Sequence, residues 1–278
     1  MHYKYDRMAV ERVLFITQEI APYVPETPMS VMGNKIPRYI QENGCEIRTF
    51  LPKWGIINER RGQLHEVIRL SGMNIIINDT DHPLLIKVAS MQPSRIQVYF
   101  IDNDDFFRKR QMAYDENGAE YPDNYERAIF YARSVIETTK LLRWFPDIVQ
   151  CQGWMSMLIP FYLKNAYKDE PTYASSKIVL SLHNQSLETP LPQEFVAMLA
   201  FRNVTPRVIN SYKMPFKTYR DFAKFCILFC DGIVCSDEDI DPELIEFAQN
   251  KNIPLLPFSK EDFPQKVQAF YNSLHDQA

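Results

Sequence analysis

The sequence predicts an α/β protein with a Rossmann-like, mostly parallel sheet, helices on both of its faces and a β-hairpin insertion. Three observations carry this prediction. Short apolar, β-branched runs recur along the chain, amphipathic stretches of helical length separate most of them, and four of the runs lie too close together for helices between them. Strands that alternate with helices form parallel sheets, whereas closely spaced strands form hairpins.

The beginning of the chain predicts a strand, a helix and a second strand. Residues 13–17 are apolar and β-branched, a loop with three prolines follows, and an amphipathic stretch covers residues 30–42. Asn43-Gly44 is a typical helix stop, and residues 45–51 alternate between apolar and polar side chains. This order is that of a βαβ unit.

The next part of the chain predicts β-hairpins that lie within the sheet or on its edge. The closely spaced apolar runs are residues 67–70, 73–77, 84–88 and 96–101. The polar and aromatic segment 102–123 is predicted to be a long loop. Loops of this length commonly carry function or mobility.

Alternation of helices and strands returns after this loop. We expect strands at residues 147–151, 177–182, 232–235 and 253–256. The expected helices cover residues 125–143, 155–167, 218–229, 242–250 and 261–274, with further helical segments up to about residue 200. The sequence contains no internal repeat and no low-complexity linker, so we expect one complete domain over residues 1–278.

Composition and charge exclude several classes of protein. The net charge of −4 and the pI of about 5.8 provide no positive field for a nucleic-acid backbone. The chain has no run of 18 apolar residues, and residues 1–12 are polar, unlike a signal peptide. We therefore expect a cytoplasmic protein that binds neither nucleic acid nor membrane.

The cysteines and the acidic run predict no metal site and no cofactor. The five cysteines lie mostly in apolar runs, which is typical of buried, reduced thiols. Cys226, Cys230 and Cys235 have no histidine near them, and nothing cationic near Cys151 would activate its thiol. Residues 102–105 contain three aspartates, a composition typical of a solvated loop.

Four segments, read in order, resemble the N-terminal domain of the glycogen and starch synthases, which are GT-B glycosyltransferases. The resemblance implies a single GT-B half, without the C-terminal domain that holds most of the nucleotide-sugar donor. It also implies glucosyl transfer from a nucleotide sugar to an α-1,4-glucan. The segments are residues 13–23 (VLFITQEIAPY), 121–131 (YPDNYERAIFY), 146–154 (PDIVQCQGW) and 180–184 (LSLHN).

Two departures from the family's pattern concern its polar motifs. The family has a Lys-Thr-Gly-Gly-Leu loop against the donor, where this chain has residues 24–29 (VPETPM), with neither lysine nor glycine. Proline in place of glycine prevents close backbone approach to phosphate, and Glu26 would repel it. In the family's His-x-His-Asp-Trp motif, Gly153 replaces the aspartate, so the carboxylate is lost.

The resemblance implies that His183 and Asn184 are the catalytic pair. They follow a parallel strand, at the edge where open α/β sheets bind ligands. The alternative is a structural pair that ties the strand end to the next loop. Glu19 is implied to bind substrate across the cleft, and its alternative role is to orient the loop backbone.

Four further residues are candidates for substrate binding, each with a structural alternative. Tyr121, Asn124 and Arg127 either contact a glycan or begin a helix that Asp123 or Asn124 caps, with Arg127 in solvent. Trp154 either stacks on a sugar ring or packs against the sheet.

The sequence leaves three functions open. The first is a glycosyltransferase domain that is inactive as an isolated chain, and the second is a non-catalytic relative that binds glucan or protein. The third is one half of a split glycosyltransferase whose other half is a separate chain. The corresponding partners are an α-glucan, a nucleotide sugar, a protein partner or a second copy of the chain.

Overall fold

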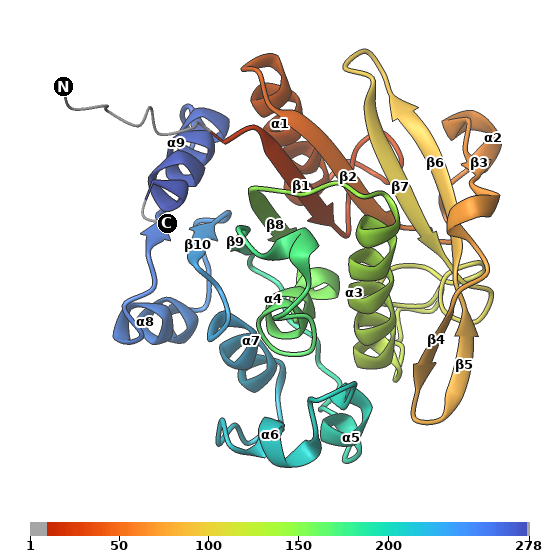
Figure 1. Ribbon diagram of the computed structural model, residues 1–278, viewed down its shortest axis with the longest axis vertical. Helices are drawn as coiled ribbons and strands as arrows, with labels where there is room; N and C mark the ends of the chain where they lie inside the picture. Colours follow the sequence, from red (N-terminus) through yellow and green to blue (C-terminus); the bar gives the residue numbers. More distant parts are fainter. Residues whose placement is uncertain (1–9, 277–278) are drawn as a thin grey trace.

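A nine-stranded sheet forms the centre of the molecule (Figure 1). The computed structural model describes residues 10–276, so most of the polar segment at the N-terminus lies outside the described residues. The strands are β1 (Arg12–Thr17), β2 (Glu46–Pro52), β3 (His65–Glu66), β4 (Asn74–Ile77), β5 (Thr80–Pro83), β6 (Leu85–Met91), β7 (Ile96–Asp102), β8 (Ile148–Gln152), β9 (Lys177–Leu182), β10 (Gly232–Cys235) and β11 (Leu255–Leu256).

The strand order confirms the predicted Rossmann-like sheet. Across the sheet the order is β11-β10-β9-β8-β1-β2-β7-β6-β3. Every neighbouring pair from β11 to β7 is parallel, and β6 and β3 add antiparallel strands at one edge. The predicted hairpins are therefore partly in the sheet, as β6–β7, and partly beside it, as the separate two-stranded β4–β5.

Helices cover both faces of the sheet. Helices α3, α4 and α7 lie in front of it in Figure 1, while α1 and α9 pack against each other on the opposite side. Right-handed crossovers explain this division, because β1 to β2 advances in one direction along the sheet and β7 to β8, β9 and β10 in the other. The helices are α1 (Pro28–Glu42), α2 (Glu59–Gly62), α3 (Asn124–Leu141), α4 (Leu158–Lys164), α5 (Phe195–Leu199), α6 (Pro206–Asn210), α7 (Tyr219–Ile227), α8 (Pro242–Asn250) and α9 (Phe263–His275).

Several of the expected elements are wrong or shorter than expected, and the last strand is reduced to Leu255–Leu256. Residues 67–70 do not form a strand, because the amides of Leu70 and Ser71 turn back onto the Val67 carbonyl and close a 3-10 turn at Ile68–Leu70. The helix expected at 155–167 is split into a 3-10 turn at Trp154–Ser156 and the shorter α4. The segment before residue 200 is helical only in α5, and residues 183–194 form a loop.

The described part of the chain contains no helix long and apolar enough to cross a membrane. All five cysteines are buried as free thiols, which confirms the expectation from their apolar surroundings. Burial raises the pKa of the Cys151 thiol well above its ordinary value, which is the environment expected of an unreactive thiol.

His82 on β5 makes the stability of the fold depend on pH. Its ring packs on Phe106, it is 6% exposed, and neither ring nitrogen has a hydrogen-bond partner among the described residues. Desolvation lowers its pKa, although the charges of Asp105 and Asp81 oppose the effect. The unfolded chain therefore takes up this proton more readily than the folded protein does, and acidification favours unfolding. The stability that neutral His82 contributes to the fold is present above the ordinary pKa of 6.5 and is lost as the pH falls through the folded-state pKa.

We expect His82→Leu to remove this part of the pH dependence. The free energy of unfolding, measured by urea denaturation at a series of pH values, should fall less steeply on acidification than in the wild type. His65→Leu, at an exposed position on the edge strand β3, is the matched control and should keep the wild-type slope. An unchanged slope in His82→Leu would contradict the assignment.

Candidate functional site

The candidate site lies at the carboxyl edge of the parallel sheet, where β9 and β10 end beside each other. His183 and Asn184 follow β9, and Asp237 lies two residues beyond β10. The Asp237 Oδ2 atom is 3.2 Å from His183 Nδ1 and accepts a hydrogen bond of 2.7 Å from the Asn184 backbone N–H. One carboxylate thus holds both residues of the sequence-predicted pair in place.

Burial and hydrogen bonding act in opposite directions on the Asp237 carboxyl group. Its desolvation raises the pKa, but the hydrogen bond and charge of His183 and the amide of Asn184 lower it by more, so the pKa lies below its ordinary value. The His183 side chain is only 3% exposed. Its Nε2 atom is buried and has no partner among the described residues.

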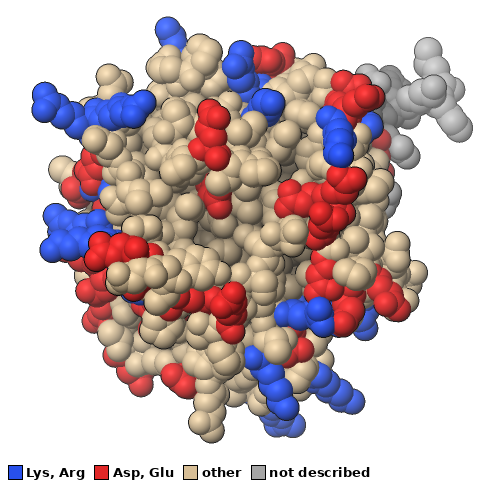
Figure 2. Space-filling view, turned by 180° about the vertical axis from the view of Figure 1, so that it is seen from behind, with Lys and Arg blue, Asp and Glu red and all other residues tan. Residues whose placement is uncertain are grey.

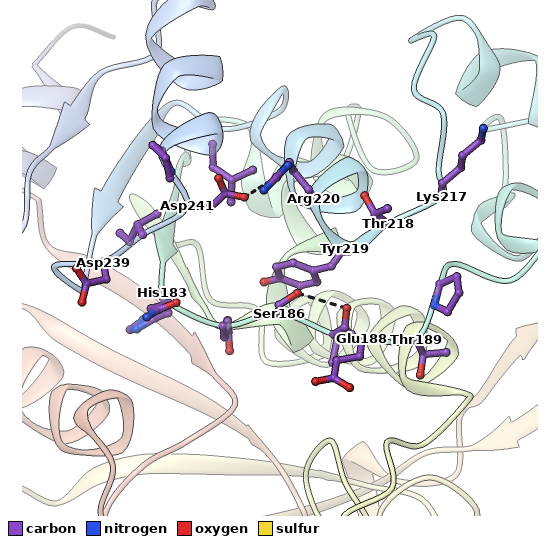
Figure 3. A pocket seen from close by; sticks show the side chains of 17 residues that line it. His183, Ser186, Glu188, Thr189, Lys217, Thr218, Tyr219, Arg220, Asp239 and Asp241 are labelled. Carbon is purple, nitrogen blue, oxygen red and sulfur yellow. Dashed lines mark hydrogen bonds and ion pairs between the residues drawn. The ribbon is translucent and has the colours of Figure 1, made fainter.

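Two cavities meet at His183. The larger, of about 920 Å³, is lined from segments 183–190, 217–220 and 239–244, so it lies between the loop after β9 and the beginnings of α7 and α8 (Figure 3). The smaller, of about 450 Å³, lies between the loop after β1 and the loops after β9 and β10. Cavities of these sizes fall in the range that holds small-molecule ligands.

The smaller cavity is lined by carboxylates. Glu19, Asp237, Glu238 and Asp239 line it, and among residues 10–276 no lysine or arginine does. Lys260 pairs with Glu238 at 2.8 Å from outside the lining. Acidic side chains also gather around a hollow on the face shown in Figure 2. A ligand with a phosphate group would meet repulsion in this cavity.

The N-terminus of α1 is closed by its own side chains. Thr27 is the N-cap, its hydroxyl accepts from the Ser30 backbone N–H, and the Ser30 hydroxyl accepts from the Thr27 backbone N–H. The Thr27 hydroxyl in turn donates to Glu19 Oε2. Pro28 occupies the first helical position and has no N–H to offer. The helix end therefore faces a carboxylate, which disfavours a second anion there.

Gly153 has a backbone conformation that other residues rarely adopt. Its φ is +84° and its ψ is 161°. A Cβ at this position would overlap the side chain of Gln18. That side chain instead forms hydrogen bonds with Glu19 and Gln185, both at 3.2 Å. The amide of Gln18 therefore lies where a side chain at position 153 would begin.

Arg127 is fully buried, so the expectation that it lies in solvent is wrong. Its guanidinium donates to three backbone carbonyls of the loop 103–123 and to Asn124 Oδ1. Asp123 occupies the N-cap position of α3, but its carboxylate pairs with Arg110 rather than capping the helix. The three carbonyls are those of Phe106, Gln111 and Met112.

Of the other candidates, only Glu19 lies at the site with His183. Tyr121, whose ring faces the guanidinium groups of Arg110 and Arg127, lines neither cavity, and the same holds for Asn124 and Trp154. Trp154 is 3% exposed, which fits its expected packing role. The substrate-binding roles of Tyr121, Asn124, Arg127 and Trp154 stay predictions.

The acidic run at 102–105 is only partly solvated, contrary to expectation. Asp102 and Asn103 are buried, and Asp102 pairs with Lys87 at 3.0 Å. Within residues 10–276 no three His, Cys, Asp or Glu side chains form a group that could hold a metal ion.

Sequence reasoning missed Asp237 and Gln18. Both lie within two residues of the end of a strand, at the carboxyl edge of the sheet. That position is a signal available in the sequence, because carboxyl ends of parallel strands lie together.

Comparison with known proteins agrees with this architecture. The family model of the starch synthase catalytic domain matches residues 12–253. A glycogen synthase of Pelodictyon phaeoclathratiforme is 32% identical over 201 residues, which are 72% of this chain and 40% of that protein. A glycogen synthase of Chlorobaculum tepidum is 33% identical over 205 residues, covering 73% of this chain and 41% of the relative. The chain thus spans about two fifths of the length of these relatives.

A solved structure supports the fold independently. The catalytic domain of starch synthase IV from Arabidopsis thaliana, bound to ADP and acarbose, superposes with a TM-score of 0.69 at 14% identity. The superposition covers 90% of this chain and 51% of that one, so the chain has the fold of one half of a GT-B enzyme. By sequence and by fold, the chain belongs to the family of the starch synthase catalytic domain.

Proposed function

We propose that this chain binds an α-1,4-glucan at the two cavities around His183 and serves as the acceptor side of a glucosyl transfer. The observation that carries the proposal is the set of groups around the two cavities at one sheet edge. The cavities are lined by hydrogen-bonding groups, and the N-terminus of α1, which borders the smaller cavity at Thr27 and Pro28, is capped by Thr27, Ser30 and Glu19. A neutral, hydroxyl-rich ligand suits these cavities, whereas a phosphate suits neither the smaller cavity, with its four carboxylates, nor the capped end of α1.

The relatives support a glucan as the ligand. The matching proteins are glycogen synthases, and the starch synthase IV structure holds acarbose as well as ADP. The larger cavity is lined by residues that can form hydrogen bonds with sugar hydroxyls, among them Asn184, Ser186, Glu188 and Thr189. We also propose a cytoplasmic location for the protein.

We further propose that the isolated chain does not transfer glucose. Transfer needs charge stabilisation of the leaving nucleotide. The loop before α1 has no lysine and no glycine, and the smaller cavity next to it is lined by four carboxylates. Incubation with labelled ADP-glucose or UDP-glucose and glycogen primer should therefore give no incorporation.

Calorimetric titration tests the binding proposal. Maltotetraose should bind to the wild type, and His183→Ala should weaken binding by about three- to tenfold, the value of one hydrogen bond. His65→Ala, an exposed histidine on the far edge strand, should bind as the wild type does. ADP-glucose and UDP-glucose should give no heat. Binding of a nucleotide sugar, or the absence of binding heat with maltotetraose, would overturn the proposal.

A further inference from the structure

The role of His183 depends on which ring nitrogen carries the proton. A neutral imidazole donates from one nitrogen and accepts at the other. The neighbours of the ring decide between the two tautomers. At His183 Nδ1 the neighbour is Asp237 Oδ2, at 3.2 Å.

The Asp237 carboxylate can only accept a hydrogen bond when it is ionised. Its lowered pKa and the second bond, from the Asn184 backbone N–H, both agree with the ionised form. Nδ1 of His183 therefore carries the proton and donates a hydrogen bond to Asp237. In the neutral ring this leaves a lone pair on Nε2.

This lone pair lacks a donor in the described part of the chain. Nε2 is buried, and an unsatisfied buried acceptor is costly. His183 belongs to the walls of both cavities, and Nε2 is its one side-chain nitrogen without a partner among the described residues. The charged groups around the smaller cavity, Glu19, Asp237, Glu238 and Asp239, are acceptors as well. The partner that His183 Nε2 lacks is therefore a hydrogen-bond donor.

We propose that Asp237 is a positioning residue that fixes His183 as a hydrogen-bond acceptor for a ligand hydroxyl group at the wall of the two cavities. The pair thereby selects a sugar hydroxyl over a phosphate oxygen, which has no proton to donate. The proposal rests on the proposed glucan binding for the identity of the hydroxyl. The tautomer itself does not depend on any ligand.

Nitrogen NMR of the ligand-free protein tests the tautomer. At about pH 8, the ¹⁵N spectrum should show His183 Nε2 as a pyridine-type nitrogen and Nδ1 as the protonated one, with the signals assigned by their loss in His183→Gln. Asp237→Ala should shift the ring toward a mixture of tautomers. Asp237→Asn keeps an acceptor oxygen and should retain the wild-type tautomer, and it also serves if the alanine variant folds poorly. A wild-type Nε2 that carries the proton would overturn the proposal.

Titration with maltotetraose separates this proposal from the proposed function. Asp237→Ala should bind about three- to tenfold more weakly than the wild type, with Asp237→Asn closer to the wild type. Glu246→Gln, which removes an exposed carboxylate on α8 that lines neither cavity, is the charge control and should bind normally. Equal affinities of Asp237→Ala and the wild type would overturn the positioning role. Absence of binding by the wild type, with the expected tautomer present, would overturn only the glucan as ligand.

Discussion

Replacing Gly153 with aspartate is expected to destabilise the fold by about 2–4 kcal/mol, although it restores the side chain found in the family's motif. Two causes add. The backbone at φ +84° and ψ 161° lies in a region that essentially only glycine occupies. The new Cβ would also overlap Gln18 and force it from its hydrogen bonds with Glu19 and Gln185. Urea denaturation monitored by circular dichroism measures the loss.

Gly118→Ala is the matched control for this prediction. Gly118 also has a positive φ, of +79°, but a Cβ there meets no atom of residues 10–276 within 4 Å. Gly118→Ala should therefore lower the free energy of unfolding only through backbone strain, without an overlap of side chains. It should destabilise the protein less than Gly153→Ala does. A double variant, Gln18→Ala with Gly153→Ala, should recover the packing part of the loss. If Gly153→Asp is as stable as the wild type, the conformation assigned to residue 153 is wrong.

Replacing Arg127 with alanine is expected to cost about 3–5 kcal/mol, since three backbone carbonyls lose their donor and a large side chain leaves the core. The guanidinium joins α3 to the loop 103–123 through bonds of 3.1, 2.5 and 2.8 Å to the carbonyls of Phe106, Met112 and Gln111. The loop should become accessible to protease before the rest of the protein unfolds. Limited proteolysis together with urea denaturation checks both effects.

Arg108→Ala provides the control for the loss of an arginine from the same region. Arg108 lies in the same loop, its side chain is 60% exposed, and Asp104 is its one ion-pair partner in the described part of the chain. Its removal should change the free energy of unfolding by no more than about 1 kcal/mol, as for other exposed ion pairs. Equal effects of the two replacements would show that Arg127 does not hold the loop.

The order of strands and helices could be predicted because each element carries its own pattern. The buried strands β1, β8 and β9 are short apolar runs, and helices such as α8 begin at clear capping residues. One failure occurs where a local turn overrides the apolar pattern of a strand. Residues 67–70 are apolar enough for a strand, but Ile68 is 83% exposed. The backbone of this segment forms hydrogen bonds within the turn, from the amides of Leu70 and Ser71 to the Val67 carbonyl.

The candidate site was only half predictable, because its residues come from distant parts of the chain. His183 and Asn184 were found from their motif and their place after β9. Their partner Asp237 lies 53–54 residues further along, with no motif of its own. Arg127 was misjudged because a charged residue near a helix start is usually solvated, and only the loop folded over α3 provides the carbonyls that allow its burial.

The sequence by itself determined that this protein is an α/β chain of the starch synthase family, with neither lysine nor glycine in the loop before α1 and with glycine in place of an aspartate at position 153. These properties follow from residue type and local order. The tertiary structure alone decided that Asp237 holds His183, that Glu19 closes the end of α1 and that Gln18 fills the space beside Gly153. Each of these depends on the meeting of strand ends at one edge of the sheet, and that proximity arises only when the crossovers between the strands have formed.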